Sequence, residues 1–309
     1  MNNIPDVQSE KPKIPIPISR VFLTDISLPG GEVVFDGRKI TLNPEIKAGI
    51  NLPHSQRGVH ASRIYEAVKY SIELLNKQLR GFEDLASTIA EELLRKNSYA
   101  THSYVSLKAT TYYTQRTPVT NFETIEKIRI LEKAEATRRA DGGIKVNAYL
   151  GAATIGMTAC PCAKEIVRSI FNRLTGNQID KDLPLGTHMQ RTYGRIMVEK
   201  FNGLKLFDLI DIISNSMSSR TFELLKREDE ARVVIDAIDN PKFVEDVARE
   251  IIIHLISKYP YIPDDTTVEA HVKALESIHS HNLAASITIK VGEVKNLMRK
   301  KLGVEEENL

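Results

Sequence analysis

The sequence predicts an α+β fold with antiparallel sheets, and three observations support this prediction. Strand-length apolar segments are joined mostly by short turns, and few strand–helix–strand crossovers of the parallel kind occur. Helical periodicity is confined to separate blocks between the strands. The order of elements also occurs twice, which divides the chain into halves at residues 14–157 and 158–298. We expect residues 1–13 to form a flexible N-terminal arm and residues 299–309 a charged tail.

The elements of the first half follow from local patterns. Residues 14–24 predict an edge strand because prolines stand at its start. The Asp36-Gly37 pair between apolar runs predicts a hairpin over residues 32–42. Apolar residues at helical spacing predict a long helix that begins near Ser62, its expected N-cap. One further helix and three strands are expected at residues 83–95, 104–113, 125–137 and 144–156.

The second half begins at a cysteine motif and repeats the alternation of helices and strands. A helix is expected over residues 163–174, directly after the motif. Pro241 suits the first turn of a helix, which predicts a long helix over residues 241–257. The other expected elements are a strand at 192–198, helices at 206–214 and 220–226, and strands at 266–275 and 282–291.

The composition excludes several classes of protein. The chain has 309 residues, of which 42% are hydrophobic and 27% charged, as in ordinary globular proteins. A net charge of +2 gives no electrostatic case for a nucleic-acid or membrane partner. Two cysteines exclude a disulfide-rich secreted scaffold. The apolar runs are too short to span a bilayer, and the start lacks a signal-peptide pattern. We therefore expect a cytoplasmic protein.

The only two cysteines lie in the sequence Cys160-Pro161-Cys162, at the start of an expected helix. A disulfide between residues this close would be badly strained. A structural zinc site would need four ligands, usually from two close pairs. A thiolate beside free helix N–H groups can instead act as a nucleophile or as one ligand of an open metal site. The alternative is a buried, inert thiol.

Four polar clusters accompany this motif, at residues 56–63, 187–191, 226–230 and 276–281. Each has a plain structural alternative: surface charge beside a helix start, a loop histidine, or the solvated end of a helix. In the last cluster, His279 and His281 are expected on one face of a strand, a recurrent metal-binding spacing. Together the clusters supply thiolate, imidazole and carboxylate ligands and leave one position for water. Their joint occurrence favours a catalytic metal site.

The wording and order of these motifs resemble the type IB GTP cyclohydrolase family, and more closely its archaeal (type IV) branch. The resemblance runs from Asp6-Val7-Gln8 through the Cys-Pro-Cys motif to Glu276-Ser277-Ile278-His279-Ser280-His281. It implies a tunnelling fold (T-fold) of tandem β-β-α-α-β-β-like units with antiparallel sheets. It also implies a homo-oligomer, a dimer or tetramer, with active sites at subunit interfaces.

The resemblance carries over to individual positions. It implies that Cys160, Glu230 and His279 bind a metal, and that His188, beside the metal, belongs to the same metal site. His281 remains open as the ligand in place of His279, and as a catalytic residue together with Cys160 and His188. The resemblance implies one Fe²⁺ per subunit, with Mn²⁺ or Zn²⁺ as substitutes. Ala163 stands where bacterial members usually have serine, and residues 173–182 have the place of an insertion.

The implied substrate is GTP, with guanine anchored by Glu276 through its N1–H and exocyclic amine. Water activated by the metal would attack guanine C8, and His188 could protonate the departing nitrogen. Positively charged side chains near these motifs are candidates for the triphosphate. They are Arg57, His60, Arg63, Lys164 and Arg191.

The implied products are 7,8-dihydroneopterin 2′,3′-cyclic phosphate, formate and pyrophosphate, in the first step of methanopterin synthesis. Three alternatives remain open. The chain could make dihydroneopterin triphosphate, as bacterial members do for folate. It could be a T-fold reductase that uses NADPH and Cys160 as the nucleophile. The paired His279 and His281 speak against the reductase. The chain could also be a non-catalytic binding module, although the clustering of cysteine, glutamate and histidine motifs speaks against that class.

Overall fold

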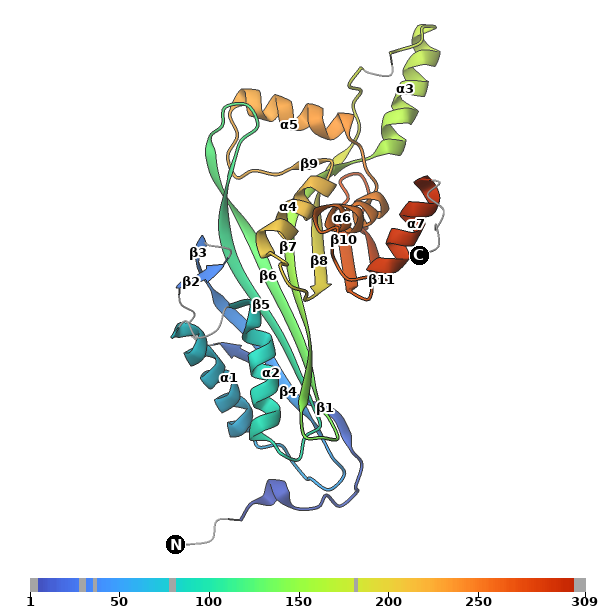
Figure 1. Cartoon of the computed structure of the whole chain (residues 1–309). Coiled ribbons are helices and arrows are strands. Elements are labelled where there is room, and N and C mark those ends of the chain that lie inside the picture. Colours follow the sequence, from blue (N-terminus) through green and yellow to red (C-terminus); the bar gives the residue numbers. More distant parts are fainter. Residues whose placement is uncertain (1–4, 28–31, 36–37, 78–81, 181–182, 303–309) are drawn as a thin grey trace. The chain divides into compact units, whose positions relative to one another are not determined.

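The computed structural model describes residues 5–27, 32–35, 38–77, 82–180 and 183–302. The chain divides into two compact units, unit 1 at residues 1–111 and 130–150 and unit 2 at residues 112–129 and 151–309. Three long strands contribute residues to both units (Figure 1). They are β5 (His102–Arg116), β6 (Glu123–Arg138) and β7 (Ile144–Ala159). The units therefore do not follow the division predicted between residues 157 and 158, because each long strand crosses the boundary between units.

Unit 1 consists of a sheet with two helices on one face (Figure 1). Its further elements are η1 (Val7–Ser9), β1 (Ile18–Ser27), β2 (Glu32–Phe35), β3 (Arg38–Thr41), β4 (Asn43–Leu52), α1 (Ala61–Asn76), η2 (Phe82–Asp84) and α2 (Leu85–Lys96). Alternate side chains of β4, among them Ile46, Ala48 and Ile50, are buried. Helices α1 and α2 bury side chains at helical spacing, such as Ile64, Val68 and Ile89. These two periodicities create the core of unit 1.

The structure confirms the predicted hairpin as β2 paired with β3, while its Asp36-Gly37 turn lies outside the described residues. Strand β4 was missed, although alternating apolar residues from Ile46 to Leu52 are typical of a half-buried strand. Ser62 is not the N-cap of α1. The helix begins at Ala61 and His60 occupies the N-cap position, without a side-chain capping bond.

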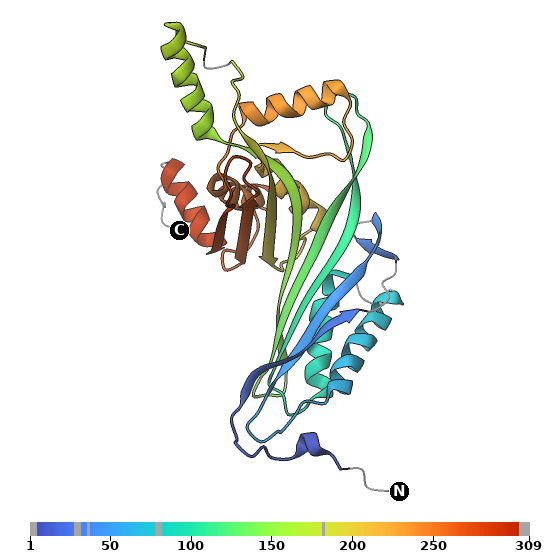
Figure 2. The ribbon, with the colours of Figure 1, turned by 180° about the vertical axis from the view of Figure 1, so that it is seen from behind.

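Unit 2 places helices α4 and α6 against strands β8, β10 and β11. Its elements are α3 (Pro161–Thr175), β8 (Met189–Glu199), α4 (Leu206–Ser216), β9 (Ser219–Arg220), α5 (Arg227–Asp239), α6 (Val244–Lys258), β10 (Thr267–Ala274), β11 (Leu283–Lys290) and α7 (Val291–Leu302). A side chain at Gly194 of β8 would collide with Ile213 and Met217, so glycine permits close packing of α4. Helix α3 extends away from the sheet, as both ribbon views show (Figure 2).

The sheet has the strand order β1–β4–β5–β6–β7–β8–β10–β11, with β9 beside β7. The pairs β1–β4, β4–β5, β8–β10, β10–β11 and β7–β9 are antiparallel. A mixed fold of helices and antiparallel strands confirms the predicted class. Among the described residues, none of the helices combines the length and apolar character that crossing a bilayer requires.

Two predictions in the second half were wrong. Residues 220–226 do not form a helix, and the charged run that begins at Lys226 opens a helix instead of closing one. The Asp229 carboxylate accepts the Lys226 N–H at 3.2 Å, which caps α5 at its N-terminus. Pro241 precedes α6, which begins at Val244 with Phe243 at the N-cap position. Helix α7 was also missed, because Val291 was assigned to the last strand and the residues from Arg299 on to a charged tail.

Candidate active site

A pocket of about 200 Å³ in unit 2 is lined by five of the predicted site residues. They come from the junction of β7 with α3, from the residue before β8 and from the connection between β10 and β11, which are distant from one another in the sequence. The lining residues are Thr158, Cys160, His188, Gln190, Lys242, Phe243, Val244, Glu276, His279, His281 and Leu283. Thiol, imidazole and carboxylate groups therefore meet at one place, as the sequence motifs predicted.

Cys160 lies where β7 ends and α3 begins, and its main chain is fixed on both sides. Its N–H donates to the His188 carbonyl at 3.1 Å, and its own carbonyl accepts the Thr187 hydroxyl at 2.7 Å. The thiol is the N-cap of α3 and accepts the Ala163 N–H at 3.4 Å. Cys160 is half-buried, whereas Cys162 is exposed. The two cysteines thus have different surroundings, and only Cys160 lines the pocket.

His188 stands just before β8 with a side chain that is only 13% exposed. Its Nδ1 lies 3.0 Å from Gln190 Oε1 and 3.9 Å from Glu276 Oε2. The Gln190 amide in turn donates through Nε2 to the Thr158 hydroxyl at 3.1 Å. The Thr158 and Thr192 hydroxyls are 2.7 Å apart and buried. A continuous chain of polar contacts therefore runs from the core of the sheet to the histidine.

Glu276, His279 and His281 lie in the connection between β10 and β11. The Glu276 side chain is 10% exposed, and its N–H donates to Asn282 Oδ1 at 3.2 Å. The rings of His279 and His281 are stacked, with centroids 5.1 Å apart. The expectation that these histidines share one face of a strand was wrong, because residues 275–282 form a loop. The loop still brings both rings to the pocket.

Lys242 is a pocket residue that the sequence motifs did not reveal. Its N–H donates to the Ala159 carbonyl at 2.9 Å, next to Cys160. Its ammonium donates to the Ser216 carbonyl at 3.2 Å and to Glu250 Oε2 at 2.5 Å. A single lysine thus joins the end of β7 to α4 and α6. Its partners lie in distant segments, so no local pattern marks it.

The structure separates three other predicted residues from this pocket lining. Glu230 lies exposed in the first turn of α5 and does not line the pocket. Lys164 is buried and donates to the Ile238 carbonyl at 2.7 Å. Arg191 is exposed on β8, one position beyond Gln190. The described part of the chain contains no group of three or more Cys, His, Asp and Glu side chains close enough to hold a metal.

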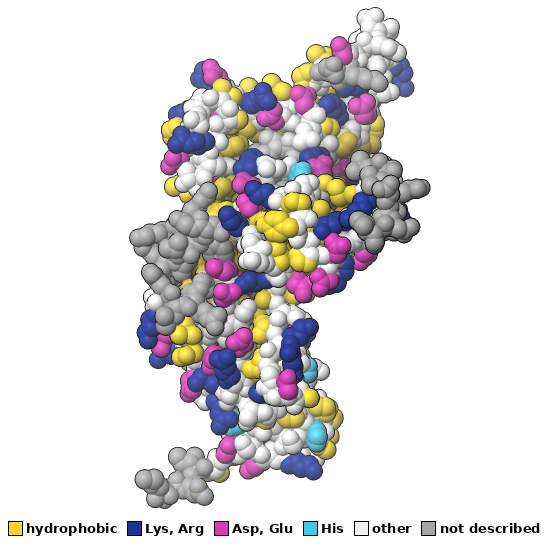
Figure 3. Space-filling view, in the orientation of Figure 1, with side chains coloured by type: hydrophobic (Ala, Val, Ile, Leu, Met, Phe, Trp, Pro, Cys, Tyr) yellow, Lys and Arg dark blue, Asp and Glu magenta, His cyan; other side chains and the backbone are white. Residues whose placement is uncertain are grey.

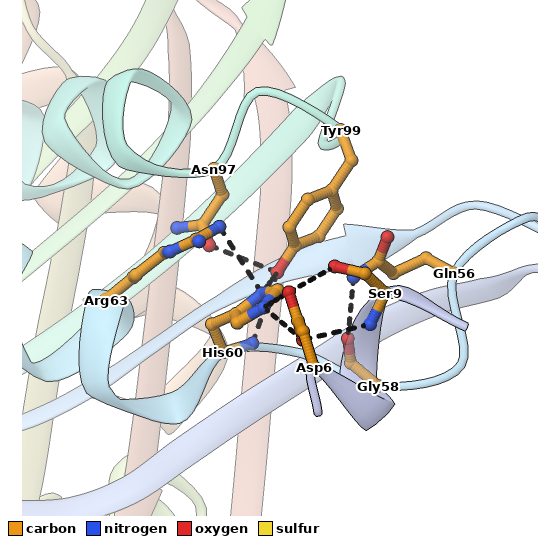
Figure 4. Close-up of polar contacts among 8 residues, drawn as sticks. All are labelled: Asp6, Ser9, Gln56, Gly58, His60, Arg63, Asn97 and Tyr99. Atoms are coloured by element: carbon orange, nitrogen blue, oxygen red, sulfur yellow. Dashed lines mark hydrogen bonds and ion pairs between the residues drawn. The ribbon is translucent and has the colours of Figure 1, made fainter. Parts of the chain in front are cut away.

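The remaining candidates for phosphate binding belong to unit 1, where His60 contacts the N-terminal segment and Arg63 contacts His60 (Figure 4). His60 Nε2 lies 3.2 Å from Asp6 Oδ1, and its Nδ1 lies 3.4 Å from both the Tyr99 hydroxyl and Arg63 Nη1. Arg57 pairs with Glu10 at 2.7 Å. These contacts hold residues 6–10 beside the start of α1. The role of Arg57, His60 and Arg63 in substrate binding stays a prediction.

Charge is mixed over the surface in Figure 3, where basic and acidic side chains alternate on the visible face. The Ser9 hydroxyl, 2.7 Å from Asp6, is the main cause that lowers the pKa of Asp6. On β10, burial is the main cause that lowers the pKa of His271, with Arg195 and Lys273 adding to the effect. The mixture of basic and acidic side chains on the visible face agrees with the near-neutral net charge of +2.

The donor types around the pocket are those that a transition metal accepts, although the described residues of the single chain do not bring three of them close enough together to hold one. Thiolate and imidazole are ligands that Fe²⁺ and Zn²⁺ both accept, and Cys160, His279 and His281 supply them at one pocket. Gln190 and Ser277 contact His188 in the way that residues around metal sites orient histidines. The carboxylate ligand predicted at Glu230 is the one member that this pocket lacks.

Comparisons of the sequence with known proteins point to one family. A family model described as type I GTP cyclohydrolase folE2 matches residues 4–285. GTP cyclohydrolase MptA of Methanothermobacter thermautotrophicus is 36% identical, over 94% of this chain and 95% of that protein. GTP cyclohydrolase MptA 1 of Methanocella arvoryzae is 37% identical, over 96% of each. A crystal structure of urate oxidase from Bacillus sp. TB-90 matches with a TM-score of 0.47 and 10% identity, over 89% of this chain and 98% of that one.

Proposed function

Because this chain belongs to the type I GTP cyclohydrolase folE2 family, we propose that it hydrolyses the imidazole ring of GTP. The proposed products are 7,8-dihydroneopterin 2′,3′-cyclic phosphate, formate and pyrophosphate, for methanopterin synthesis. The observation that carries the proposal is the gathering of Cys160, His188, Glu276, His279 and His281 around one pocket. The relatives named MptA favour the cyclic phosphate over the triphosphate product.

Glu276 is the proposed guanine anchor. Its carboxylate is largely buried at the pocket and can accept hydrogen bonds from both guanine N1–H and the exocyclic amine. Adenine lacks this pair of donors, so binding it would leave the carboxylate unsatisfied. The main-chain bond from Glu276 to Asn282 holds the loop that carries this side chain. Glu276 therefore selects the base.

His188 is the proposed proton carrier for ring opening. It lines the same pocket as Glu276 and lies 3.9 Å from its carboxylate, so it would lie beside a guanine bound there. An imidazole changes its protonation near neutral pH more readily than other side chains. It can therefore donate a proton to the nitrogen that leaves C8.

Cys160 and His279, or His281 in its place, are the proposed metal ligands of this pocket, with Glu230 as the carboxylate ligand. Fe²⁺ is the proposed metal, one per subunit, and Mn²⁺ or Zn²⁺ are substitutes. Such a metal supplies Lewis acidity that lowers the pKa of a bound water. The chain fixes Cys160 through three main-chain and thiol hydrogen bonds, which preserves the position of the sulfur.

The proposed enzyme is a homo-oligomer, a dimer or tetramer, with active sites completed by neighbouring subunits. Two observations support this. Glu230 lies outside the pocket of its own chain, so a second copy can supply it. Helix α3 also carries apolar side chains that are 41–74% exposed in the single chain, at Ile166, Ile170, Phe171 and Leu174. Exposed apolar faces of this kind mark interaction surfaces.

We also propose that the fold is a T-fold of tandem units. Antiparallel strands with paired helices on one face occur in both units, with α1 and α2 in one and α4 and α6 in the other.

The triphosphate of GTP is proposed to bind Arg57, His60, Arg63, Lys164 and Arg191. Among these, the position of Arg191 next to a pocket residue of β8 gives it the best support.

The proposal is tested by anaerobic reconstitution. Full-length protein is stripped of metal, supplied separately with Fe²⁺, Mn²⁺ or Zn²⁺, and incubated with GTP, and the products are resolved by mass. Formate with a cyclic phosphate product is the expected result. A triphosphate product would replace the proposed product with that of the folate branch. Absence of GTP turnover with all three metals would overturn the proposed activity.

A further inference from the structure

We propose that Gln190 is a positioning residue that keeps the proton of neutral His188 on Nδ1, so that Nε2 is the nitrogen available to the pocket. The assignment of His188 to catalysis rests on the proposed function, whereas the position of its proton rests on the contacts below. Gln190 was part of a sequence motif but had no role in the mechanism. A role in fixing the histidine tautomer gives it one.

The direction of the hydrogen bonds around Gln190 determines which nitrogen of His188 carries the proton. Its amide nitrogen donates to the Thr158 hydroxyl at 3.1 Å, which leaves Oε1 turned toward His188. Oε1 lies 3.0 Å from His188 Nδ1 and can only accept. The contact is a hydrogen bond only if Nδ1 carries the proton. The Thr158 hydroxyl is itself held in place by the Thr192 hydroxyl, 2.7 Å away inside the sheet.

The negative charge of Glu276 favours the same tautomer, and its effect does not depend on the orientation of the Gln190 amide. Glu276 Oε2 lies 3.9 Å from the same nitrogen, and both side chains are largely buried. A lone pair on Nδ1 would face this carboxylate and be repelled, whereas an N–H is attracted to it. The Ser277 hydroxyl, 3.5 Å from Nδ1, can accept from it as well. The Gln190 hydrogen bond and the charge of Glu276 therefore both place the proton on Nδ1.

The surroundings of the other ring nitrogen of His188, Nε2, agree with this tautomer. No described residue forms a hydrogen bond with His188 Nε2, although the ring lines the pocket. With Nδ1 protonated, Nε2 carries the lone pair. It is then the atom through which His188 can accept a proton, return it, or approach a metal. A histidine in the opposite tautomer would offer the pocket only a donor.

The test observes the tautomer directly. Full-length protein labelled with ¹⁵N-histidine, metal-free and Zn²⁺-loaded, is studied by two-bond ¹H–¹⁵N correlation spectra of the rings. A His188→Asn variant identifies the signals of this ring among the eight histidines. We expect the Nδ1–H pattern in the wild type. An Nε2–H pattern in metal-free wild type would overturn the proposal without any need for a variant.

Two variants then test Gln190 itself. Gln190→Leu removes the acceptor at similar volume, so we expect His188 to shift toward Nε2–H and kcat to fall roughly 10–100-fold, with KM for GTP nearly unchanged. Gln190→Glu keeps an acceptor and should retain the Nδ1–H pattern and most of the activity. Ser71→Ala is the matched control, because it removes a buried hydroxyl in α1, whose bond to the Ala67 carbonyl has no part in the contacts of Gln190 or His188.

Retention of the Nδ1–H pattern in folded Gln190→Leu would overturn the role of Gln190. If Gln190→Leu does not fold, the role depends on Gln190→Glu, and an Nε2–H pattern in that variant overturns it. The Nδ1–H pattern in a wild type that does not turn over GTP would remove the proposed activity but leave the tautomer assignment intact. The spectra and the product assay thus fail independently.

Discussion

The carboxylate of Asp229 accepts both the N–H of Thr120, at 2.9 Å, and its hydroxyl, at 2.5 Å, across 109 positions of the sequence. It also accepts the N–H groups of Val119 and Lys226. Burial alone would raise the pKa of Asp229, but these hydrogen bonds outweigh it and hold the pKa far below its ordinary value of 3.8. One fully buried side chain thus joins the start of α5 to the turn between β5 and β6.

Replacement of Asp229 by alanine is therefore expected to destabilise unit 2. All four donors would lose their acceptor, and we expect the thermal midpoint to fall by about 5 °C or more in differential scanning calorimetry. Glu228→Gln changes an exposed acid in the same helical turn and should leave the midpoint nearly unchanged. Equal midpoints for Asp229→Ala and wild type would contradict this reading of the contacts.

The same substitution has a predicted pH dependence. Because the folded pKa of Asp229 is depressed, its ionised form contributes stability above the unfolded value near 3.8. That contribution is lost as the pH falls through the folded value. The difference in thermal midpoint between wild type and Asp229→Ala should therefore be constant above about pH 5 and narrow below about pH 4. A difference that grows on acidification would contradict the assignment.

The two cysteines provide a matched pair of variants within one motif. Cys160→Ser should reduce the iron bound per subunit roughly tenfold or more, because it removes a thiolate ligand from the pocket. Cys162→Ser should bind iron as the wild type does, since Cys162 is exposed and does not line the pocket. Metal content is measured by mass spectrometry after anaerobic loading. Equal iron in both variants would remove Cys160 from the ligand set.

Glu276→Ala should lose recognition of guanine while its metal content stays intact. We expect kcat/KM for GTP to fall by a factor of 100 or more, roughly the cost of leaving buried donors of the base unpaired. Steady-state kinetics with parallel metal analysis makes this distinction. Glu293→Gln, which changes an acid in the first turn of α7, is the control. Unchanged turnover of the Glu276→Ala variant would show that another residue anchors the base.

Arg191 and Lys164 were both predicted to bind the triphosphate, but their surroundings predict different consequences of substitution. Arg191 is exposed on β8, one position beyond the pocket residue Gln190, so Arg191→Ala should raise KM for GTP roughly tenfold and leave stability unchanged. Lys164 is buried and bonded to the Ile238 carbonyl, so Lys164→Ala should cost about 1–3 kcal/mol of folding free energy. Kinetics and chemical denaturation of both variants separate the two effects. The reverse pattern would exchange the two roles.

A charge introduced into the exposed apolar side chains of α3 should weaken the association of subunits. Leu174 is 74% exposed in the single chain, so Leu174→Glu should leave the fold intact but weaken subunit association roughly tenfold or more. Analytical ultracentrifugation measures the dissociation constant. Ser169→Glu adds the same charge to another exposed position of α3 and is the control. An unchanged sedimentation profile for Leu174→Glu would exclude these side chains from the interface.

Local patterns predicted much of the fold, because apolar spacing and turn residues act over a few positions. The hairpin of β2 and β3 and the helix after Cys160 are examples. The start of α5 was predicted wrongly. The bond between Lys226 and Asp229 that caps it spans only three positions, but the Asp229 carboxylate is held in place by Val119 and Thr120, which are remote in the sequence. A charged run that begins a helix and one that ends it look alike until the partner is known.

In the candidate site, too, some residues could be recognised from the local sequence, whereas others depend on partners that are remote in the sequence. Cysteine, histidine and glutamate carry recognisable chemistry, so the motifs that contain Cys160 and His279 could be singled out before the structure was known. Gln190 and Lys242 could not, because an amide or an ammonium acquires its role from its partners. Those partners, such as Thr158 and Glu250, come from other strands and helices. Sequence reasoning identifies reactive groups more readily than the groups that orient them.

The pocket also has a consequence for biosynthesis. Its residues span the chain from Thr158 to Leu283, and about 120 residues separate Cys160 from His279. At ordinary elongation rates the ribosome needs roughly 6–24 s to add that length. During this interval the nascent chain carries its thiol without the partner imidazole. A metal site that used both side chains would therefore be complete only after the β10–β11 hairpin has been translated and has paired with β8.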